Sequence, residues 1–339
     1  MEIFKRRGLI SLIAILILGC VFFGLHALSV GSGALDNPGR PEGRPLQKIT
    51  FALDWTPNTN HTGLFVAKEN GYFKELGLEV EFVQPPEDTA TALVASKKAD
   101  FGIDFQDTLA PAFASDIPVT AIAAIVQHNT SGIISLKENN ITSPKGLENR
   151  KYATWDLPVE QAILSHCVKL DGGDYNKINL IPTYVIDVVI GLQTDVDAVW
   201  IYYGWDGIAT KVNNLETNFF FFKDIDPMLD YYTPVIVGNN EFMLKNPEIT
   251  KKFLDACKKG YEYAIDNPEA AANILLKEDP SLDPTLVLES QKWMSREYKA
   301  NEEQWGYIDS SRWNSFYKWL YDNELIGREI MGGFSNEYL

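Results

Sequence analysis

Short apolar runs alternate with amphipathic helical patterns along most of this chain, and this alternation restricts the fold more than any other feature. Residues 78–83 carry apolar side chains at every second position, which is typical of a half-buried strand. Similar strand-like runs occur at 49–53, 100–103 and 119–126, with helical patterns between them. A strand–helix repeat of this kind predicts an α/β unit built on a parallel sheet.

The same rhythm starts again at Gly132 and predicts a second α/β unit. Strands are expected at residues 133–134, 151–155, 178–181 and 197–201, and residues 232–237 are expected to form the strand that leaves this unit. The C-terminal part, from 241 to 325, is predicted to be mainly helical. Two α/β units that face one another create a cleft, which is a preferred place for a ligand.

The N-terminus has the pattern of an export signal. Lys5, Arg6 and Arg7 precede a run without Asp, Glu, Lys or Arg from residue 8 to residue 30. The sequence Ile-Leu-Gly-Cys that ends at Cys20 resembles a bacterial lipobox, so acylation of Cys20 is expected. An uncleaved membrane anchor and cleavage after Ala34 are the two alternatives. Residues 1–34 are therefore predicted to be a signal peptide or membrane anchor, and the Pro- and Gly-rich residues 35–46 a flexible tether.

The charge balance excludes several classes of partner. The chain has 30 Lys+Arg against 46 Asp+Glu, a formal net charge of −16. Residues 1–34 contribute three positive charges and one negative charge, so the rest carries −16 − 2 = −18. Such an acidic chain is not expected to bind nucleic acid or to adhere electrostatically to anionic lipid. Three cysteines cannot form a disulfide framework, and their spacing matches no zinc pattern.

No established catalytic motif occurs in the sequence. Gly-x-Ser-x-Gly, the P-loop, His-Glu-x-x-His and Gly-x-Gly-x-x-Gly are all missing. Neither metal chemistry nor phosphate transfer has support from the sequence, so we expect no cofactor, no metal and no catalytic residue.

Two aromatic clusters follow predicted strands and begin predicted helices. The first runs from Asp54 to Gly63 and combines Trp55 with amide side chains, which suits a flat polar ligand. The second runs from Trp200 to Asp206 and places two Tyr and a Trp beside a carboxylate, which suits an amino-substituted nitrogen heterocycle. The alternative is structural: Trp55 covering the core, and Asp206 capping a helix over core aromatics.

These clusters carry a family resemblance. Residues 51–67, 71–78, 100–103, 127–132 and 197–206 resemble segments of the substrate-binding proteins that serve the uptake of thiamine pyrimidine precursors, above all the formylaminopyrimidine-binding proteins of ABC importers. The wider group includes fungal pyrimidine-precursor synthases and nitrate- or sulfonate-binding proteins. The resemblance covers roughly residues 48 to 330.

The resemblance implies a type II periplasmic-binding-protein fold: two α/β lobes joined by two hinge strands, with a helical C-terminal part. Lobe 1 would comprise residues 47–133 and 237–339 and lobe 2 residues 134–236, with hinges near 133–136 and 233–237. The protein would bind its ligand at the extracytoplasmic face of the bacterial membrane as a monomer. It would deliver the ligand to an ABC permease and ATPase for thiamine biosynthesis or salvage.

The resemblance also assigns roles to residues. Trp55 and Tyr202 would stack on the pyrimidine, and Asp206 would bind its amino edge, where Glu is the family's expected residue. Asn60 would hydrogen-bond to the ligand, with Asp54 and His61 also involved. Further candidates are Ser131, Trp155, Tyr203, Trp205 and Tyr232.

Two alternatives remain beside this interpretation. The same fold binds other solutes, such as riboflavin, nitrate or alkyl sulfonates, although Asp54 and Asp206 disfavour the anions. A precursor synthase would carry a cysteine-rich stretch where this chain has residues 231–236, and a Lys that this chain lacks between Trp55 and Val66. We therefore expect a binding protein and not an enzyme.

Overall fold

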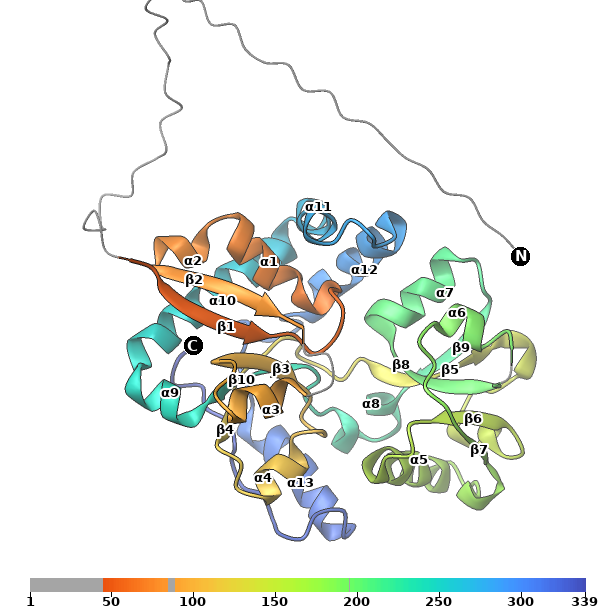
Figure 1. The fold of residues 1–339 in the computed structure, drawn as a ribbon. Coiled ribbons are helices and arrows are strands. Elements are labelled where there is room, and N and C mark those ends of the chain that lie inside the picture. Colours follow the sequence, from red (N-terminus) through yellow and green to blue (C-terminus); the bar gives the residue numbers. More distant parts are fainter. Residues whose placement is uncertain (1–44, 85–88, 195) are drawn as a thin grey trace, which may run out of the picture. The chain divides into compact units, whose positions relative to one another are not determined.

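The computed structural model describes residues 45–84, 89–194 and 196–339 (Figure 1). The predicted signal or anchor, Cys20 and most of the predicted tether lie outside the described residues. Within those ranges, no helix combines the length and the apolar character that a bilayer crossing requires.

Two five-stranded sheets organise the described chain, and each defines a lobe. The lobe 1 sheet has the order β2-β1-β3-β10-β4 and the lobe 2 sheet the order β7-β6-β8-β5-β9. Lobe 1 contains β1 (Gln47–Ala52), β2 (Leu78–Val83), β3 (Phe101–Asp104), β4 (Val119–Ala124) and β10 (Val235–Asn239). Lobe 2 contains β5 (Ser131–Leu136), β6 (Lys151–Thr154), β7 (Asn179–Pro182), β8 (Ala198–Tyr202) and β9 (Thr217–Phe221). Both lobes belong to one compact unit of the chain.

The two sheets follow the same plan, and both are mixed rather than parallel. One strand of each sheet arrives directly from the other lobe, β10 in lobe 1 and β5 in lobe 2. When the remaining four strands are numbered in chain order within their lobe, each sheet has the order second, first, third, arriving strand, fourth. β10 runs antiparallel to β3 and β4, and β5 runs antiparallel to β8 and β9. The expectation of wholly parallel sheets was therefore wrong for these strands. A strand that enters a sheet directly from the other lobe has no crossover helix to return it to the starting edge, so it runs in the opposite direction.

Most helices lie where the sequence pattern predicts them, whereas the short helices α6 and α8 were not predicted. Lobe 1 has α1 (Thr62–Glu69), α2 (Tyr72–Glu75), α3 (Ala90–Ala95) and α4 (Ala110–Ala114), followed in the C-terminal part by α9 (Asn240–Lys245), α10 (Pro247–Asp266), α11 (Pro268–Glu278), α12 (Pro284–Glu297) and α13 (Ser310–Asp322). Lobe 2 has α5 (Pro158–Leu170), α6 (Val188–Gly191), α7 (Ile208–Val212) and α8 (Phe222–Ile225).

Proline and glycine residues set several of these boundaries. Pro268 and Pro284 stand at the starts of α11 and α12, where a missing N–H costs no intrahelical hydrogen bond. Gly71 has φ +78°, a left-handed conformation that separates α1 from α2. A side chain at Gly260 of α10 would collide with the Gly63 carbonyl of α1, so these two glycines allow the helices to pack closely.

Two connections join the lobes. The first leads from the end of β4 at Ala124 to Ser131, and the second leads from Leu229 to Val235. Of the predicted hinge segments, residues 133–136 lie inside β5, whereas 233–237 span the end of the second connection and the start of β10.

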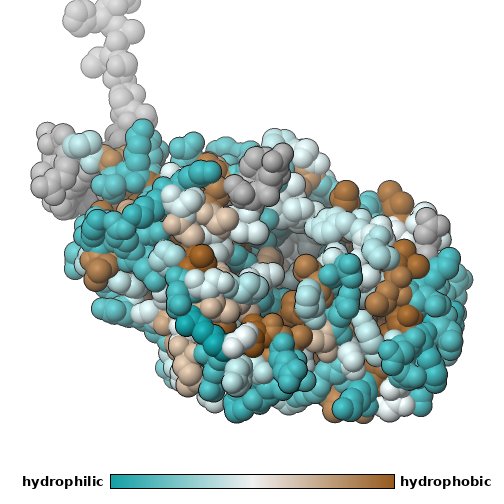
Figure 2. Space-filling model, turned by 60° about the horizontal axis from the view of Figure 1, so that its bottom comes forward, coloured by the Kyte–Doolittle hydropathy of each residue, from teal (hydrophilic) through white to brown (hydrophobic). Residues whose placement is uncertain are grey.

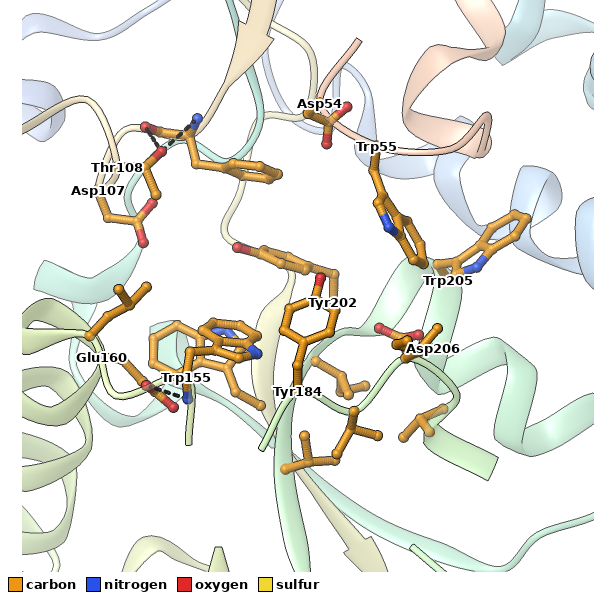
Figure 3. Close-up of a pocket in the computed structure, with 18 of the residues that line it drawn as sticks. Asp54, Trp55, Asp107, Thr108, Trp155, Glu160, Tyr184, Tyr202, Trp205 and Asp206 are labelled. Carbon is orange, nitrogen blue, oxygen red and sulfur yellow. Dashed lines mark hydrogen bonds between the residues drawn. The ribbon is translucent and has the colours of Figure 1, made fainter. Parts of the chain in front are cut away.

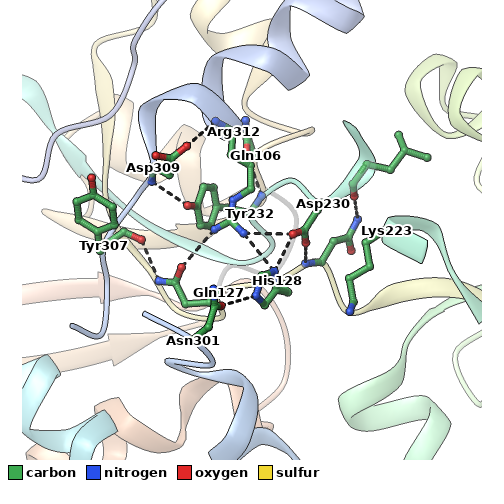
Figure 4. Close-up of polar contacts among 12 residues, drawn as sticks. Gln106, Gln127, His128, Lys223, Asp230, Tyr232, Asn301, Tyr307, Asp309 and Arg312 are labelled. Atoms are coloured by element: carbon green, nitrogen blue, oxygen red, sulfur yellow. Dashed lines mark hydrogen bonds and ion pairs between the residues drawn. The ribbon is translucent and has the colours of Figure 1, made fainter. Parts of the chain in front are cut away.

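A polar network ties these two connections to each other and to the C-terminal helix (Figure 4). His128 Nδ1 lies 2.7 Å from Asp230 Oδ2, and Arg312 Nη1 of α13 donates to the same carboxyl at 3.2 Å. The Arg312 guanidinium also lies over the Tyr232 ring, 3.9 Å from its centroid. Hydrogen bonding to Asp230, partly offset by burial, raises the pKa of His128, so the network favours its charged form.

Hydrophilic residues cover most of the face shown in Figure 2, and apolar residues lie there in small separate patches. The apolar side chains instead fill three cores. One packs between α1, α10 and the lobe 1 sheet, one lies on one side of the lobe 2 sheet, and one connects α4, α5 and α13. Cys167 belongs to the last of these, and burial raises the pKa of its thiol to about 12, as expected for an unreactive buried cysteine.

Candidate ligand-binding site

A cavity of about 370 Å³ lies between the two lobes (Figure 3). Lobe 1 contributes residues from the turn after β1 and from the loop after β3. Lobe 2 contributes residues from the ends of β6 and β8 and from the segment before α6. The lining residues are Asp54, Trp55, Asn58, Asn60, Phe105, Asp107, Thr108, Trp155, Leu157, Val159, Glu160, Tyr184, Val185, Ile186, Val188, Val199, Trp200, Ile201, Tyr202, Trp205 and Asp206.

The turn after β1 is fixed by a chain of hydrogen bonds through His61. The backbone N–H of Asn58 donates to His61 Nδ1 at 3.2 Å, so His61 Nε2 carries the proton and donates to Asp54 Oδ1 at 2.6 Å. Asn58 also accepts from the Asn60 N–H at 2.8 Å and thereby caps the short helical turn that precedes α1. The buried His61 thus holds Asp54 in place beside the cavity, and Trp55 follows directly.

The loop after β3 is fixed by its middle residue. Gln106 points away from the cavity and bonds to the backbone of Tyr232. Its own backbone N–H donates to the Tyr232 carbonyl at 3.0 Å, and its side-chain Oε1 accepts from the Tyr232 N–H at 2.8 Å. Its amide nitrogen donates to the Trp313 carbonyl at 2.9 Å. The loop is a turn closed by the Leu109 N–H, which donates to the Phe105 carbonyl at 3.0 Å, and it leaves Phe105, Asp107 and Thr108 lining the cavity.

The lobe 2 wall begins where β8 ends. Tyr202 is the last residue of this strand, and a single π-helical turn, Tyr203–Gly207, carries Trp205 and Asp206 to the cavity. The Tyr202 ring stacks on Phe105, with 5.3 Å between centroids. Aromatic rings from both lobes therefore meet at the cavity.

Trp155 is positioned by a buried carboxyl. Glu160 accepts hydrogen bonds from the Tyr152 hydroxyl at 2.8 Å, from Thr154 Oγ1 at 2.9 Å and from the Trp155 N–H at 3.0 Å. Its hydrogen-bonding capacity is thus largely used by the protein. Glu160 acts as a support for the Trp155 wall.

The lobes also meet outside the cavity, where α12 packs against α7 and the π-helical turn. Ser290 of α12 bonds to Thr59 Oγ1 of lobe 1 at 2.7 Å and donates to the Gly204 carbonyl of lobe 2. This pair of contacts links the turn after β1 to the turn after β8, the two turns that hold Trp55 and Asp206.

The lining is acidic, and none of the lining residues is Lys, Arg or His. Burial raises the pKa of Asp206 to about 7, with Asp187 adding a smaller increase. Burial also raises the pKa of Asp107 to about 7. These two carboxyls, one on each lobe, can therefore exist in either protonation state near neutral pH.

Six of the predicted site residues line the cavity: Asp54, Trp55, Asn60, Trp155, Tyr202 and Asp206. Three do not. His61 lies behind Asp54, and Ser131 is buried and bonds to Asn129 Oδ1 at 2.7 Å. Tyr203 packs against Phe219, Phe221 and Trp293. Among the secondary candidates, Trp205 lines the cavity, whereas Tyr232 belongs to the network around Arg312.

Sequence reasoning missed Phe105, Asp107 and Tyr184. The first two follow β3 just as Trp55 follows β1, so the rule that ligands bind at strand ends pointed to them as well. Tyr184 follows β7 in a segment without a recognisable pattern. In the described ranges, no group of three or more His, Cys, Asp or Glu residues is arranged to hold a metal ion.

The repeated sheet plan and the two lobes around a cavity define the periplasmic-binding-protein fold, which confirms the expected fold class. The periplasmic aliphatic sulphonate-binding protein from Escherichia coli has this fold, with a TM-score of 0.65, 12% identity and coverage of 84% of this chain and 95% of that one.

The chain belongs to the NMT1/THI5-like family, whose sequence model matches residues 58–271. It is 28% identical over 295 residues to the formylaminopyrimidine-binding protein of Halalkalibacterium halodurans, covering 84% of this chain and 88% of the relative. It is 26% identical over 316 residues to a 4-amino-5-hydroxymethyl-2-methylpyrimidine phosphate synthase of Saccharomyces cerevisiae, covering 86% and 88%. The expected relation to thiamine pyrimidine proteins is therefore confirmed, and the relatives include both binding proteins and synthases.

Proposed function

We propose that this protein is the extracytoplasmic solute-binding component of an ABC importer, and that it binds formylaminopyrimidine or a related aminopyrimidine for thiamine biosynthesis or salvage. The observation that carries the proposal is the composition of the cavity. Aromatic rings from both lobes and four carboxyls, Asp54, Asp107, Glu160 and Asp206, line it without any Lys, Arg or His. Such a lining disfavours nitrate, sulfonates and phosphate esters, because it offers an anion no compensating charge.

The aromatic residues match a flat ring with two faces. Trp55 of lobe 1 and Tyr202 of lobe 2 come from opposite walls, so a pyrimidine between them would be held by both lobes. Each aromatic contact contributes about 0.5–1.5 kcal/mol beyond the burial of apolar area. Closure of the lobes about the two connections would complete this arrangement.

Asp206 matches the edge of an aminopyrimidine. Such an edge presents an amino N–H donor beside a ring nitrogen. A protonated carboxyl complements both, because its O–H donates to the ring nitrogen and its C=O accepts from the amino group. A carboxylate would do the same for a ring that carries the proton, with charge-assisted bonds. A pKa of about 7 makes both forms accessible to Asp206.

The aromatic rings and carboxyls of the cavity suit the recognition of a ring. His61, the residue that the sequence shares with the synthases in this turn, donates its Nε2 proton to Asp54 and is buried away from the cavity. We therefore propose capture and delivery of an unchanged ligand to a permease and ATPase.

We further propose that the N-terminal segment holds the protein at the outer face of the cell membrane through acylated Cys20. The basic residues 5–7 and the uncharged run that follows support this. Radiolabelled palmitate should be incorporated into the wild type and not into Cys20→Ala. Equal labelling of the two would overturn the lipid anchor without affecting the ligand proposal.

Calorimetry on the purified full-length protein in mild detergent tests the ligand directly. We expect formylaminopyrimidine to bind and an alkyl sulfonate not to bind under the same conditions. Binding of the sulfonate alone would overturn the proposal.

A further inference from the structure

Ser290 of α12 is fully buried, lies outside the cavity lining and joins the two lobes through its hydroxyl. Its O–H donates to the Gly204 carbonyl of lobe 2, so its oxygen accepts from Thr59 Oγ1 of lobe 1 at 2.7 Å. Thr59 belongs to the turn after β1, and Gly204 belongs to the π-helical turn that carries Trp205 and Asp206 to the cavity. One hydroxyl therefore connects the turns that form opposite walls of the cavity.

α12 is fixed to lobe 1 around Ser290. It packs on α10 and α11, and Gln291 Nε2 donates to the Ala264 carbonyl of α10 at 3.3 Å. The hydroxyl of Tyr298, which ends α12, donates to the Thr59 carbonyl at 2.5 Å. Thr59 is thus held to α12 at two points. The Ser290–Thr59 bond therefore stays within lobe 1, and the Ser290–Gly204 bond is the one that crosses between the lobes.

Gly204 brings the π-helical turn into direct contact with α12, which lies beside α7 in Figure 1. A β-carbon at Gly204 would meet the Met294 sulfur and, at 3.0 Å, the Trp293 ring, both on α12. Gly204 does not have a positive φ, so the need for glycine comes from this contact and not from the local backbone conformation. Tyr203 also packs on Trp293, with 5.4 Å between the ring centroids. We call this contact of Tyr203 and Gly204 with Ser290, Trp293 and Met294 the α12 seam.

The α12 seam lies near the first connection between the lobes but not on it. The Gln127 N–H of that connection donates to the carbonyl of Glu297, at the end of α12, at 3.1 Å. Ser290 lies seven residues earlier, about 10 Å along the helix axis. A rotation of about 15° at the connection would thus move Ser290 and Gly204 apart by about 3 Å, which is enough to break a hydrogen bond. The bond can therefore exist only when the lobes are together.

We propose that Ser290 is a positioning residue, which holds the two ligand-binding turns together once the lobes have met and so sets how long a ligand stays bound. The inference rests on the proposed function, in which Trp55 and Asp206 hold the ligand from opposite lobes. Without the Ser290 hydroxyl, the buried Gly204 carbonyl would lose its donor in the closed form, whereas water can replace that donor in the open form. Loss of the hydroxyl therefore speeds ligand release and leaves ligand capture unchanged.

Stopped-flow fluorescence of the full-length protein with formylaminopyrimidine tests this, because Trp55 and Trp205 line the cavity and report on binding. We expect Ser290→Ala to raise the dissociation rate constant by about 5-fold to 30-fold and to keep the association rate constant within about threefold of wild type. Ser295→Ala is the matched control, since Ser295 donates to the Lys292 carbonyl of its own helix at 3.0 Å. The control should change neither rate, and an unchanged dissociation rate in Ser290→Ala overturns the proposal.

Gly204→Ala tests the α12 seam from the other lobe. Its methyl group would hold the π-helical turn away from α12, so the dissociation rate constant should rise by at least about 5-fold. Urea unfolding of the ligand-free protein then separates positioning from a purely structural role, because the midpoints of Ser290→Ala and Ser295→Ala should agree. A lower midpoint in Ser290→Ala together with the wild-type dissociation rate would show that the bond persists in both lobe arrangements, which would overturn the proposal.

A second probe separates this inference from the proposed function. If the wild type binds an alkyl sulfonate and not formylaminopyrimidine, the proposed function fails. Ser290→Ala should then still raise the dissociation rate constant of the sulfonate by about 5-fold to 30-fold, because Ser290 does not line the cavity and acts on any ligand held between the lobes. An unchanged rate with whichever of the two compounds binds would overturn the inference, and binding of neither would overturn both.

Discussion

Phe105 of lobe 1 stacks on Tyr202 of lobe 2, with 5.3 Å between the ring centroids and 24° between the ring planes. Because the rings come from different lobes, this contact requires the lobes to be close together. Both rings also line the cavity, so the surface proposed to hold the ligand is itself an interlobe contact.

Replacing Phe105 by Ala should therefore weaken ligand binding through the loss of a lobe-to-lobe contact. We expect the Kd measured by calorimetry to rise by about 3-fold to 10-fold, the equivalent of one aromatic pair. Phe105→Tyr keeps the ring and serves as the control. An unchanged Kd in Phe105→Ala would show that the stack contributes nothing to the bound state.

Trp55→Ala should weaken binding and leave the fold intact. The side chain is 37% exposed at the cavity, so its removal costs little core packing. We expect at least about a 10-fold rise in Kd and a shift in Tm of less than about 2 °C. Tyr321→Ala is the matched control, because this aromatic residue on α13 is 43% exposed and does not line the cavity. Equal affinity of the two variants would contradict the assignment of Trp55.

Asp206→Asn should weaken binding at neutral pH. The amide can donate to a ring nitrogen and accept from the amino group, but it cannot supply a negative charge to a protonated ring, so a charge-assisted bond worth about 1.5–3 kcal/mol is lost. For a ring that binds in its protonated form, calorimetry should then show a Kd raised by about 10-fold to 100-fold. Wild-type affinity in Asp206→Asn would show that Asp206 binds as the neutral acid, and wild-type affinity in Asp206→Ala would remove it from the site.

The same substitution should stabilise the ligand-free protein at alkaline pH. The folded-state pKa of Asp206 is about 7, above its ordinary value of 3.8, so the folded state holds this proton longer than the unfolded state. The resulting stability is fully present below about pH 4 and is lost as the pH rises through about 7. Urea unfolding should show Asp206→Asn more stable than wild type by about 1–3 kcal/mol at pH 8, with little difference at pH 4. A pH-independent difference would contradict the raised pKa.

His128 should make the stability of the wild type fall at higher pH. Its pKa is raised chiefly by the hydrogen bond to Asp230, so its contribution is fully present below the unfolded-state pKa of 6.5 and is lost as the pH rises through the folded-state value. We expect His128→Gln to lose about 1 kcal/mol of unfolding free energy at pH 6 and less at pH 9. Urea titrations at both pH values check this, and an equal loss at both would indicate that the charge of His128 has no part in the network.

The sequence predicted the parts of the site that depend on strand ends. Trp55 and Tyr202–Asp206 follow runs whose apolar character marks them as strands, and the structure brings them to one cavity. The helix breaks at Gly71 and at Pro268 were likewise predictable, because both residues impose local backbone conformations.

Other features depend on contacts that sequence patterns do not encode. The antiparallel direction of β5 and β10 follows from where the chain crosses between the lobes. The spacing of apolar residues does not indicate the direction of a strand, so the sequence could not predict this. The burial of Asp107 depends on Gln106 anchoring its loop to Tyr232 and Trp313, residues more than a hundred positions away. His61 was predicted as a ligand contact, but it does not line the cavity. Both of its ring nitrogens bond to the protein, to Asp54 and to the Asn58 N–H.

The strand β10 lies between β3 and β4 in the lobe 1 sheet, although it is the last strand of the described residues. Until residues 235–239 have been synthesised, β3 has no partner on that side and β4 has none of its sheet contacts. Lobe 1 therefore cannot complete its sheet before the whole of lobe 2 has left the ribosome. Completion of the lobe 1 sheet is thereby delayed to a late point in synthesis.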